Sequence, residues 1–194
     1  NIEVRDGIWL REANRGIELK GKFFAIIGYG FMGEALAKRL KGFDVKVVAY
    51  DKYKTNFSSK YVEEVSMDFI YKNADFVSLH TPLTPETKDL VNTSFINLFN
   101  KPFFLINTAR GHSVKVVDLM EALENQKIIG ACLDVLEFES TSFEKFSYAD
   151  NPKFKSLVKF NNVLLTPHIA GWTVESKEKM AQVILNKIHD KFIS

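Results

Sequence analysis

The chain has 194 residues, of which 46% are hydrophobic and 26% charged, and its formal net charge is +2. These values are typical of an ordinary globular domain. The single cysteine excludes an internal disulfide, so a reducing, cytoplasmic setting is expected. No apolar run reaches the roughly 20 residues of a membrane helix, and the basic and acidic residues are interleaved. We therefore expect small-molecule partners, with no nucleic acid and no membrane.

Short runs rich in Val, Ile, Leu and Phe recur along the chain without polar alternation, which is typical of parallel strands buried on both faces. The runs predicted as strands are 23–28, 45–50, 76–80, 103–107, 128–135 and 163–166. The stretches predicted as helices between them are 32–41, 61–71, 94–99 and 116–124. This alternation predicts an α/β fold with a doubly wound parallel sheet, whose ligands bind at the carboxyl edge of the strands.

A glycine motif, Gly28-Tyr-Gly30-Phe-Met-Gly33, stands directly after the first predicted strand and directly before a helix. The first glycine allows a tight turn, the second lets a pyrophosphate approach the backbone, and the third lets the helix pack closely on the strand. The helix N-terminus adds free N–H groups that favour an anion. The alternative is a merely flexible turn, but the position between strand and helix favours dinucleotide binding.

The second predicted strand ends at Asp51, eighteen residues after Gly33. An acidic side chain at about this offset accepts hydrogen bonds from the adenosine ribose hydroxyls and repels a 2′-phosphate. The sequence therefore favours NAD over NADP, although Lys52 and Lys54 weaken the exclusion. The alternative is that Asp51 is only a solvated loop residue.

Three further strand ends carry polar groups on the same predicted edge, and they lie in 78–82, 107–111 and 166–171. Arg110 follows a strand directly and can present its planar fork to a carboxylate or carbonyl oxygen, so it is a candidate substrate clamp. Taken alone, Arg110 could equally form a surface ion pair. The convergence of three such strand ends favours a functional site.

His168 is the best acid/base candidate, because a histidine at a strand end can exchange protons near neutral pH when a carboxylate orients its ring. Asp134 or Glu139 could be that carboxylate. We interpret Cys132 as a small core residue within an apolar strand rather than a nucleophile. His112 and His189 lack the spacing of metal ligands, so no metal site is predicted.

The runs GIELKGKFFAIIGYGFMGEALAKRL, SLHTPLTPET, INTARG, GACLDV and NVLLTPHIAGWT, in this order, resemble the D-isomer-specific 2-hydroxyacid dehydrogenases. The resemblance implies a Rossmann-like NAD-binding domain and hydride transfer between the nicotinamide and a D-2-hydroxy acid. It also implies that Arg110 binds the substrate carboxylate and carbonyl, that His168 exchanges the C2 hydroxyl proton, and that Glu139 pairs with His168 to keep it basic.

The expected cofactor contacts come partly from the motifs and partly from this resemblance. They are Gly28, Gly30, Phe31, Met32, Gly33, Asp51, His80, Thr81, Pro82, Thr108, Ala109, Arg110, Asp134, His168 and Gly171. The chain departs from the family pattern at Ser140, where the family usually has proline after the catalytic glutamate. The substrate domain of the family is largely missing, so we expect this chain to bind NAD but to turn over poorly.

We divide the chain into an N-terminal linker or interface segment, 1–20, a dinucleotide-binding domain, 21–172, and a C-terminal amphipathic helix, 173–194. In this last part apolar residues recur at helical spacing. The weakly periodic stretch 140–162 is predicted as a surface excursion. By resemblance we expect a homodimer, because the family pairs through this domain and both ends of the chain offer apolar surface.

Alternative functions are an NAD-sensing protein like the corepressors that resemble this family, and a fragment that folds and dimerises without a cofactor. The resemblance implies a small 2-hydroxy or 2-oxo acid as the substrate. The sequence does not decide between hydroxypyruvate, glyoxylate, D-lactate-type acids and D-3-phosphoglycerate. The run HIAGWT slightly favours a phosphoglycerate dehydrogenase-like enzyme.

Overall fold

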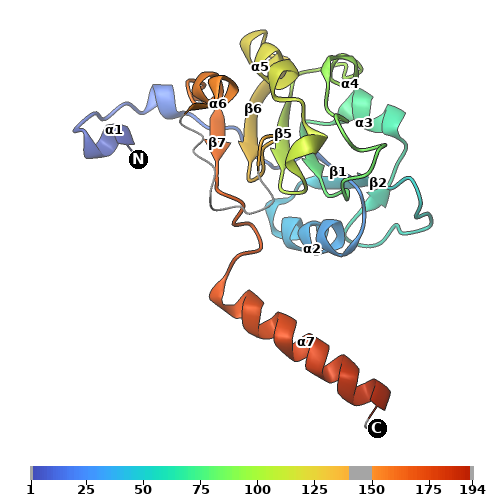
Figure 1. Ribbon diagram of the computed structural model, residues 1–194. Helices are drawn as coiled ribbons and strands as arrows, with labels where there is room; N and C mark the ends of the chain where they lie inside the picture. Colours follow the sequence, from blue (N-terminus) through green and yellow to red (C-terminus); the bar gives the residue numbers. More distant parts are fainter. Residues whose placement is uncertain (1, 140–149, 193–194) are drawn as a thin grey trace.

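The computed structural model describes residues 2–139 and 150–192 (Figure 1). Its centre is a sheet of seven strands in the order β3-β2-β1-β4-β5-β6-β7, with every neighbouring pair parallel. The strands are β1 Phe23–Ile27, β2 Lys46–Tyr50, β3 Glu63–Glu64, β4 Phe76–Leu79, β5 Phe103–Asn107, β6 Ile128–Leu133 and β7 Val163–Leu165. The reversal of strand order at β1 confirms the predicted doubly wound α/β fold.

The helices are α1 Ile2–Arg5, α2 Phe31–Leu40, α3 Met67–Asn73, α4 Thr93–Asn97, α5 Val116–Glu124, α6 Pro152–Leu157 and α7 Val174–Phe192. Short 3₁₀ turns are η1 Glu12–Asn14, η2 Lys41–Phe43 and η3 Gly111–Ser113. Side-chain caps fix the starts of three helices, because Ser66, Asn92 and Asn151 each accept a backbone N–H from the first turn of α3, α4 and α6.

The prediction of a helix over 61–71 was wrong in its first half. Glu63 and Glu64 form the edge strand β3, which pairs with β2 through the Val48–Glu63 and Ala49–Glu64 register. The amide of Val65 then donates to the carbonyl of Ala49, and Ser66 caps α3. The sheet therefore has seven strands rather than the six predicted, because pairing with β2 outweighs the local helical pattern.

The two faces of the sheet are covered unequally. Helices α3, α4, α5 and α6 pack on one face and build the larger core around Leu105 and Phe103. On the other face α2 and the stretch before β3 cover β1 and β2, with Ile26 and Ala37 at the centre of the smaller core. This smaller cluster leaves the same face of β6 and β7 open.

Two predictions about burial were wrong. Cys132 is exposed on β6 rather than part of the core. Its side chain lies on the same sheet face as α2, but α2 covers only β1 and β2 and does not extend to β6, where Cys132 lies beside exposed Leu164 of β7. The stretch 140–162 is not only a surface excursion: it contains α6, which inserts the fully buried Leu157 into the larger core. The part of that stretch from 140 to 149 lies outside the described residues.

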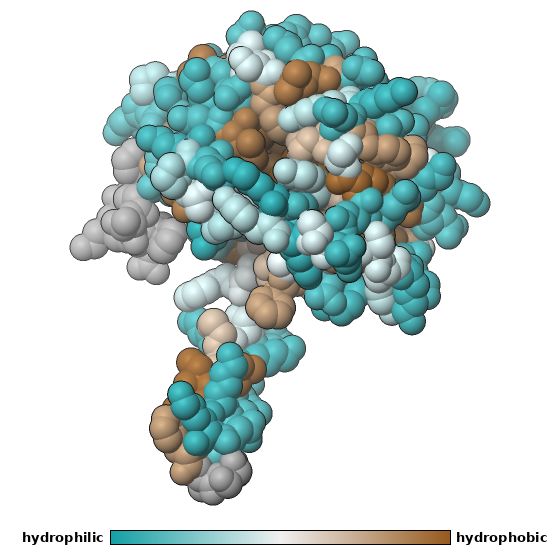
Figure 2. Space-filling view, turned by 90° about the vertical axis from the view of Figure 1, so that its right-hand side faces the viewer, coloured by the Kyte–Doolittle hydropathy of each residue, from teal (hydrophilic) through white to brown (hydrophobic). Residues whose placement is uncertain are grey.

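The two ends of the chain stand apart from the sheet (Figure 1). The amphipathic helix expected at the C-terminus is α7, and none of its residues is buried. Figure 2 shows it clear of the domain with hydrophobic side chains on its surface. In the part of the chain that the structure describes, no helix has the length and apolar character to span a membrane.

Candidate active site

The turn between β1 and α2 is shaped by its first glycine. Gly28 has a φ of +93°, and a Cβ there would lie 2.8 Å from the carbonyl of His80 at the end of β4. This position therefore excludes other residues. Gly30 is the N-cap of α2 and faces open space, Gly33 is buried in the first turns, and no side chain caps the free N–H groups. The turn thus has the form of an anion cradle.

Two apolar residues follow this cradle at the start of α2. Phe31 is 95% exposed, and Met32 is also exposed. Neither side chain is needed for the packing of the domain, and both stand beside the free N–H groups of the helix. They are thus accessible to a molecule that binds at the turn.

Asp51, at the end of β2, accepts three backbone hydrogen bonds. Its Oδ2 lies 2.8 Å from the amide nitrogen of Tyr29, and its Oδ1 lies 2.9 Å from that of Tyr53 and 3.0 Å from that of Lys54. Burial by itself raises the pKa of Asp51, but the N–H groups of Tyr53, Tyr29 and Lys54 outweigh it and hold the pKa below its ordinary value. The carboxylate is therefore ionised at neutral pH.

A cavity of about 340 Å³ opens between the glycine turn, Asp51 and the loop after β4. Gly28, Gly30, His80, Thr81 and Pro82 are among the residues that line it. The Oγ1 of Thr81 is buried and has no hydrogen-bond partner among the described residues. A cavity that joins a glycine cradle, an ionised carboxylate and an unpaired hydroxyl fits the phosphate and ribose groups of a dinucleotide.

His80 itself lies within this strand end. Its Nε2 is 2.9 Å from the Oγ of buried Ser78, and burial lowers the pKa of its imidazole. The ring is therefore neutral at pH 7 and tied to β4. This placement makes His80 a part of the cavity wall rather than a second proton carrier.

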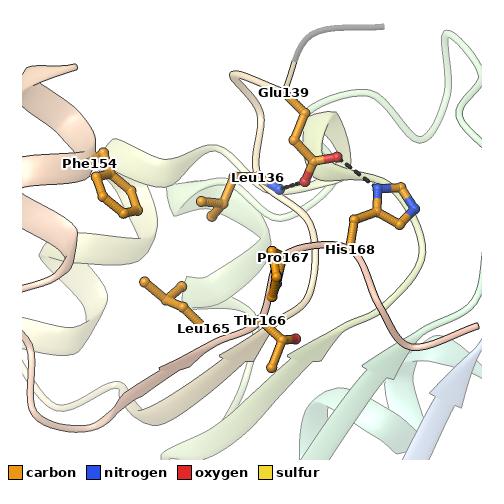
Figure 3. A pocket seen from close by; sticks show the side chains of 7 residues that line it. All are labelled: Leu136, Glu139, Phe154, Leu165, Thr166, Pro167 and His168. Carbon is orange, nitrogen blue, oxygen red and sulfur yellow. Dashed lines mark hydrogen bonds and ion pairs between the residues drawn. The ribbon is translucent and has the colours of Figure 1, made fainter. Parts of the chain in front are cut away.

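A second cavity, of about 220 Å³, lies at the ends of β6 and β7 (Figure 3). The Nδ1 of His168 is 2.9 Å from Oε2 of Glu139, and the other carboxylate oxygen accepts the amide N–H of Leu136. Glu139 is thus fixed by its own turn and orients the imidazole, leaving Nε2 on the far side of the ring. Of the two carboxylates considered from the sequence, Glu139 is the one paired with His168.

Asp134 also contacts the segment that carries His168, but it binds Thr166 and two backbone amides. Its Oδ1 lies 2.6 Å from Oγ1 of Thr166 and 2.8 Å from the amide nitrogen of Ile169, and its Oδ2 lies 2.9 Å from that of Ala170. Burial raises the pKa of Asp134, but these donors and the nearby His168 lower it more strongly. The carboxylate stabilises the left-handed backbone of His168, whose φ is +56°.

Arg110 follows β5 and is exposed. The side chain of Asn107 fixes its backbone: Nδ2 donates to the carbonyl of Arg110 over 3.0 Å, and Oδ1 accepts the amide of Ala109 over 3.1 Å. The guanidinium donates to the carbonyl of Ala109 and pairs with no carboxylate among the described residues. It is therefore free to receive an acid from outside the chain.

Gly111 was not among the site residues predicted from the sequence, although it lies where the loop that carries Arg110 meets the turn that carries Glu139. A Cβ at this position would lie 1.9 Å from the carbonyl oxygen of Leu136, so the loop after β5 packs directly against the turn that holds Glu139. The sequence signal was only the glycine after Arg110.

The remaining predicted residues are more peripheral. Thr108 is exposed beside buried Ala109, and Gly171 is exposed with nothing near the position of a Cβ. Within residues 2–139 and 150–192, no three His, Cys, Asp or Glu side chains lie close enough to hold a metal ion.

The sheet order, the glycine turn and the carboxylate after β2 define a dinucleotide-binding domain of the doubly wound class. Residues 1–170 match the family model described as "D-isomer specific 2-hydroxyacid dehydrogenase, NAD binding domain". The chain belongs to this family, as its motifs predicted.

Individual relatives agree with this assignment. The chain is 38% identical over 187 residues to the glyoxylate reductase of Thermofilum pendens, covering 93% of this chain and 52% of that one. It is 34% identical over 187 residues to the hydroxypyruvate reductase of Thermotoga maritima, covering 96% and 58%. The NAD-complexed D-isomer specific 2-hydroxyacid dehydrogenase of Lactobacillus delbrueckii ssp. bulgaricus superposes with a TM-score of 0.83 and 32% identity, covering 95% and 59%. The chain thus spans about half the length of the curated relatives it matches.

Proposed function

We propose that this chain supplies the cofactor-binding half of an NAD-dependent D-2-hydroxyacid dehydrogenase. The observation that carries the proposal is the pairing of His168 with Glu139 at 2.9 Å, on the same sheet edge as the glycine turn and Asp51. A proton-exchanging group thereby stands beside a dinucleotide cradle, which is the combination that hydride transfer to or from an alcohol requires. No observation favours the corepressor alternative.

In this proposal the N–H groups at the start of α2 and the Thr81 hydroxyl receive the phosphates, while Asp51 accepts the ribose hydroxyls. NAD supplies the hydride acceptor at C4 of its nicotinamide when bound. Asp134, which holds the backbone amides of Ile169 and Ala170, would act as a positioning residue for the nicotinamide end. The other proposed cofactor contacts are Gly28, Gly30, Phe31, Met32, Gly33, His80, Pro82, Thr108, Ala109, Arg110, His168 and Gly171.

The protein's own contribution to the reaction comes from three side chains. Arg110 binds the carboxylate and C2 oxygen of the acid through its fork of N–H donors. His168 takes the C2 hydroxyl proton through Nε2 during oxidation and returns it during reduction. Glu139 holds the Nδ1 side of the ring and stabilises the imidazolium that forms when His168 takes up the proton.

The proposed substrate is a small D-2-hydroxy acid or its 2-oxo partner. Glyoxylate, hydroxypyruvate, D-lactate and D-3-phosphoglycerate are the acids in the names of its relatives. D-3-phosphoglycerate remains our first substrate to test. We propose a cytoplasmic location, since the one cysteine of this chain cannot form a disulfide within it.

Calorimetric titration with NADH and NADPH tests the proposed cofactor site. We expect micromolar affinity for NADH and weaker binding of NADPH. Asp51→Ala should lower NADH affinity at least about tenfold, because it removes the acceptor of the ribose hydroxyls. Since Asp51 also holds three backbone amides, Asp51→Asn, which keeps one acceptor oxygen, is measured beside it with a thermal melt of each variant.

Asp75→Ala is a matched control. Asp75 likewise accepts a backbone amide, that of Phe23, but it lies at the opposite edge of the sheet, just before β4. Its loss should cost stability and leave NADH affinity unchanged in the folded protein. Absence of NADH binding to the folded wild-type chain would contradict the proposed function.

A further inference from the structure

Beyond the carboxylate of Asp51, the rim of the cofactor cavity carries a second acidic group, Glu86. We propose that Glu86 is a specificity-determining residue. It forms an ion pair with Lys52 and so weakens the attraction of this lysine for the 2′-phosphate of NADP. The inference rests on the proposed function, since it concerns how the same cavity chooses between two dinucleotides. Lys52, Tyr53 and Glu86 all line this cavity.

Both oxygens of Glu86 are engaged by the segment that follows Asp51. The Nζ of Lys52 lies 2.7 Å from Oε1, and the hydroxyl of Tyr53 lies 2.6 Å from Oε2. The three side chains thus join the end of β2 to the loop after β4 across the cavity rim. Lys52 lines the same cavity as Asp51, the residue proposed to accept the ribose hydroxyls.

The loop that carries Glu86 is built to present it. The Oγ1 of Thr87 donates to the carbonyl of Pro82 over 2.6 Å and accepts the amide of Thr84 over 2.8 Å. The amide of Lys88 closes the turn on the carbonyl of Thr84. Glu86 lies between these bonds, so the position of its backbone does not depend on the ion pair with Lys52.

The second lysine beside Asp51 is also occupied. The Nζ of Lys54 lies 5.1 Å from the centre of the Tyr29 ring and 3.4 Å from the Tyr29 carbonyl oxygen. The Tyr29 ring in turn stacks on Phe57, with ring centres 4.6 Å apart. Among the described residues, then, the ammonium groups of Lys52 and Lys54, the two lysines next to Asp51 in the sequence, both have partners other than Asp51.

The physical consequence is a competition. A 2′-phosphate meets Asp51 and Glu86 as like charges, and it gains the ammonium of Lys52 only by sharing it with Glu86 or displacing Glu86 from it. The Lys52 and Glu86 side chains are about half exposed, so their pairing is a weak, salt-screened interaction. Removing the charge of Glu86 should therefore change selectivity by a modest and measurable factor.

The test is a titration of the full chain and its Glu86→Gln variant with NADH, NADPH, 5′-AMP and adenosine 2′,5′-bisphosphate. We expect the affinity for the two 2′-phosphorylated ligands to rise about threefold to tenfold, and that for NADH and 5′-AMP to change less than about twofold. The gain should shrink as the salt concentration rises.

Two further variants separate the mechanism from a change in overall charge. Lys52→Gln in the Glu86→Gln background should remove most of the gain, because the freed ammonium is its main source and the lost repulsion by Glu86 supplies only the remainder. Glu124→Gln removes the same charge from an exposed position on α5 and should leave all four affinities unchanged. NADH binding with an unaltered affinity for NADPH in Glu86→Gln would overturn this inference alone, whereas failure of the wild-type chain to bind NADH would overturn the proposed function beneath it.

Discussion

Asp134 holds the backbone that carries His168, and it does so as a buried anion with three donors. Because its pKa is lowered in the folded state, its contribution to stability is complete above the unfolded pKa of about 3.9 and is lost as pH falls through the folded value. We predict that Asp134→Asn lowers the free energy of unfolding by about 2 kcal/mol at pH 7, because the amide offers fewer acceptor sites.

This deficit should shrink as the pH falls below about 3.9, since protonation of the folded wild-type carboxylate then removes its advantage over the amide. Urea unfolding at a series of pH values measures it. Asp6→Asn, at an exposed position near the N-terminus, is the control and should give no difference at any pH. A deficit for Asp134→Asn that is constant with pH would show that the carboxylate's charge is not what stabilises the segment.

At the scale of elements, α7 and the segment 2–20 present apolar surface that nothing in the described chain covers. Trp9 is 78% exposed, and exposed Ile8 and Leu10 flank it. We propose that these parts pair two copies of the chain, and sedimentation equilibrium should then give a mass above the 22.2 kDa of one chain. Trp9→Ser should weaken dimerisation by about 2 kcal/mol.

Leu98→Ser serves as the matched control for this prediction. Leu98 is also exposed and apolar, but it lies at the end of α4, outside both proposed contact segments. It should leave the dimer unchanged. A wild-type chain that sediments as a monomer at micromolar concentration would contradict the proposed homodimer.

Periodicity and turn chemistry were sufficient to predict six strands, α7 and the edge where Asp51, Arg110 and His168 lie, because these are local patterns repeated along the chain. The two-residue strand β3 was missed, since it exists only through pairing with β2. The exposure of Cys132 was missed for a related reason: an apolar strand does not say which of its faces a helix will cover.

Within the site, too, contacts between loops that are distant in the sequence could not be predicted from local patterns. From the residues alone Glu139 and Asp134 were both candidates for pairing with His168, and the family resemblance implied Glu139. The folded turn from Leu136 to Glu139 brings that carboxylate to the imidazole. The need for glycine at 111 comes from the carbonyl of Leu136, a contact between distant loops. The pairing of Lys52 with Glu86 likewise joins loops that follow different strands.

At the scale of the whole molecule, the proposed site is an exposed surface rather than an enclosed cleft. The side chain of His168 is 35% exposed, Arg110 is exposed, and the cavity beside Glu139 holds only about 220 Å³. Hydride transfer benefits from excluding water and from holding the reacting atoms in contact, which a second body closing over the cofactor provides in two-domain enzymes. The chain spans only about half the length of its curated relatives, so this closure is not expected from these 194 residues alone.

We therefore predict that the 194-residue chain binds NADH but reduces the 2-oxo partner of D-3-phosphoglycerate, glyoxylate, hydroxypyruvate and pyruvate at less than about 1% of an ordinary rate of about 10 s⁻¹. The loss of NADH absorbance measures turnover, and titration of the same sample establishes that the cofactor is bound. The full-length glyoxylate reductase of Thermofilum pendens is the positive control for the assay. Steady turnover near 10 s⁻¹ by the chain itself would contradict this prediction. It would mean that Arg110, His168 and Glu139 suffice without a second domain, because the exposed site would then already hold substrate and cofactor in reacting geometry.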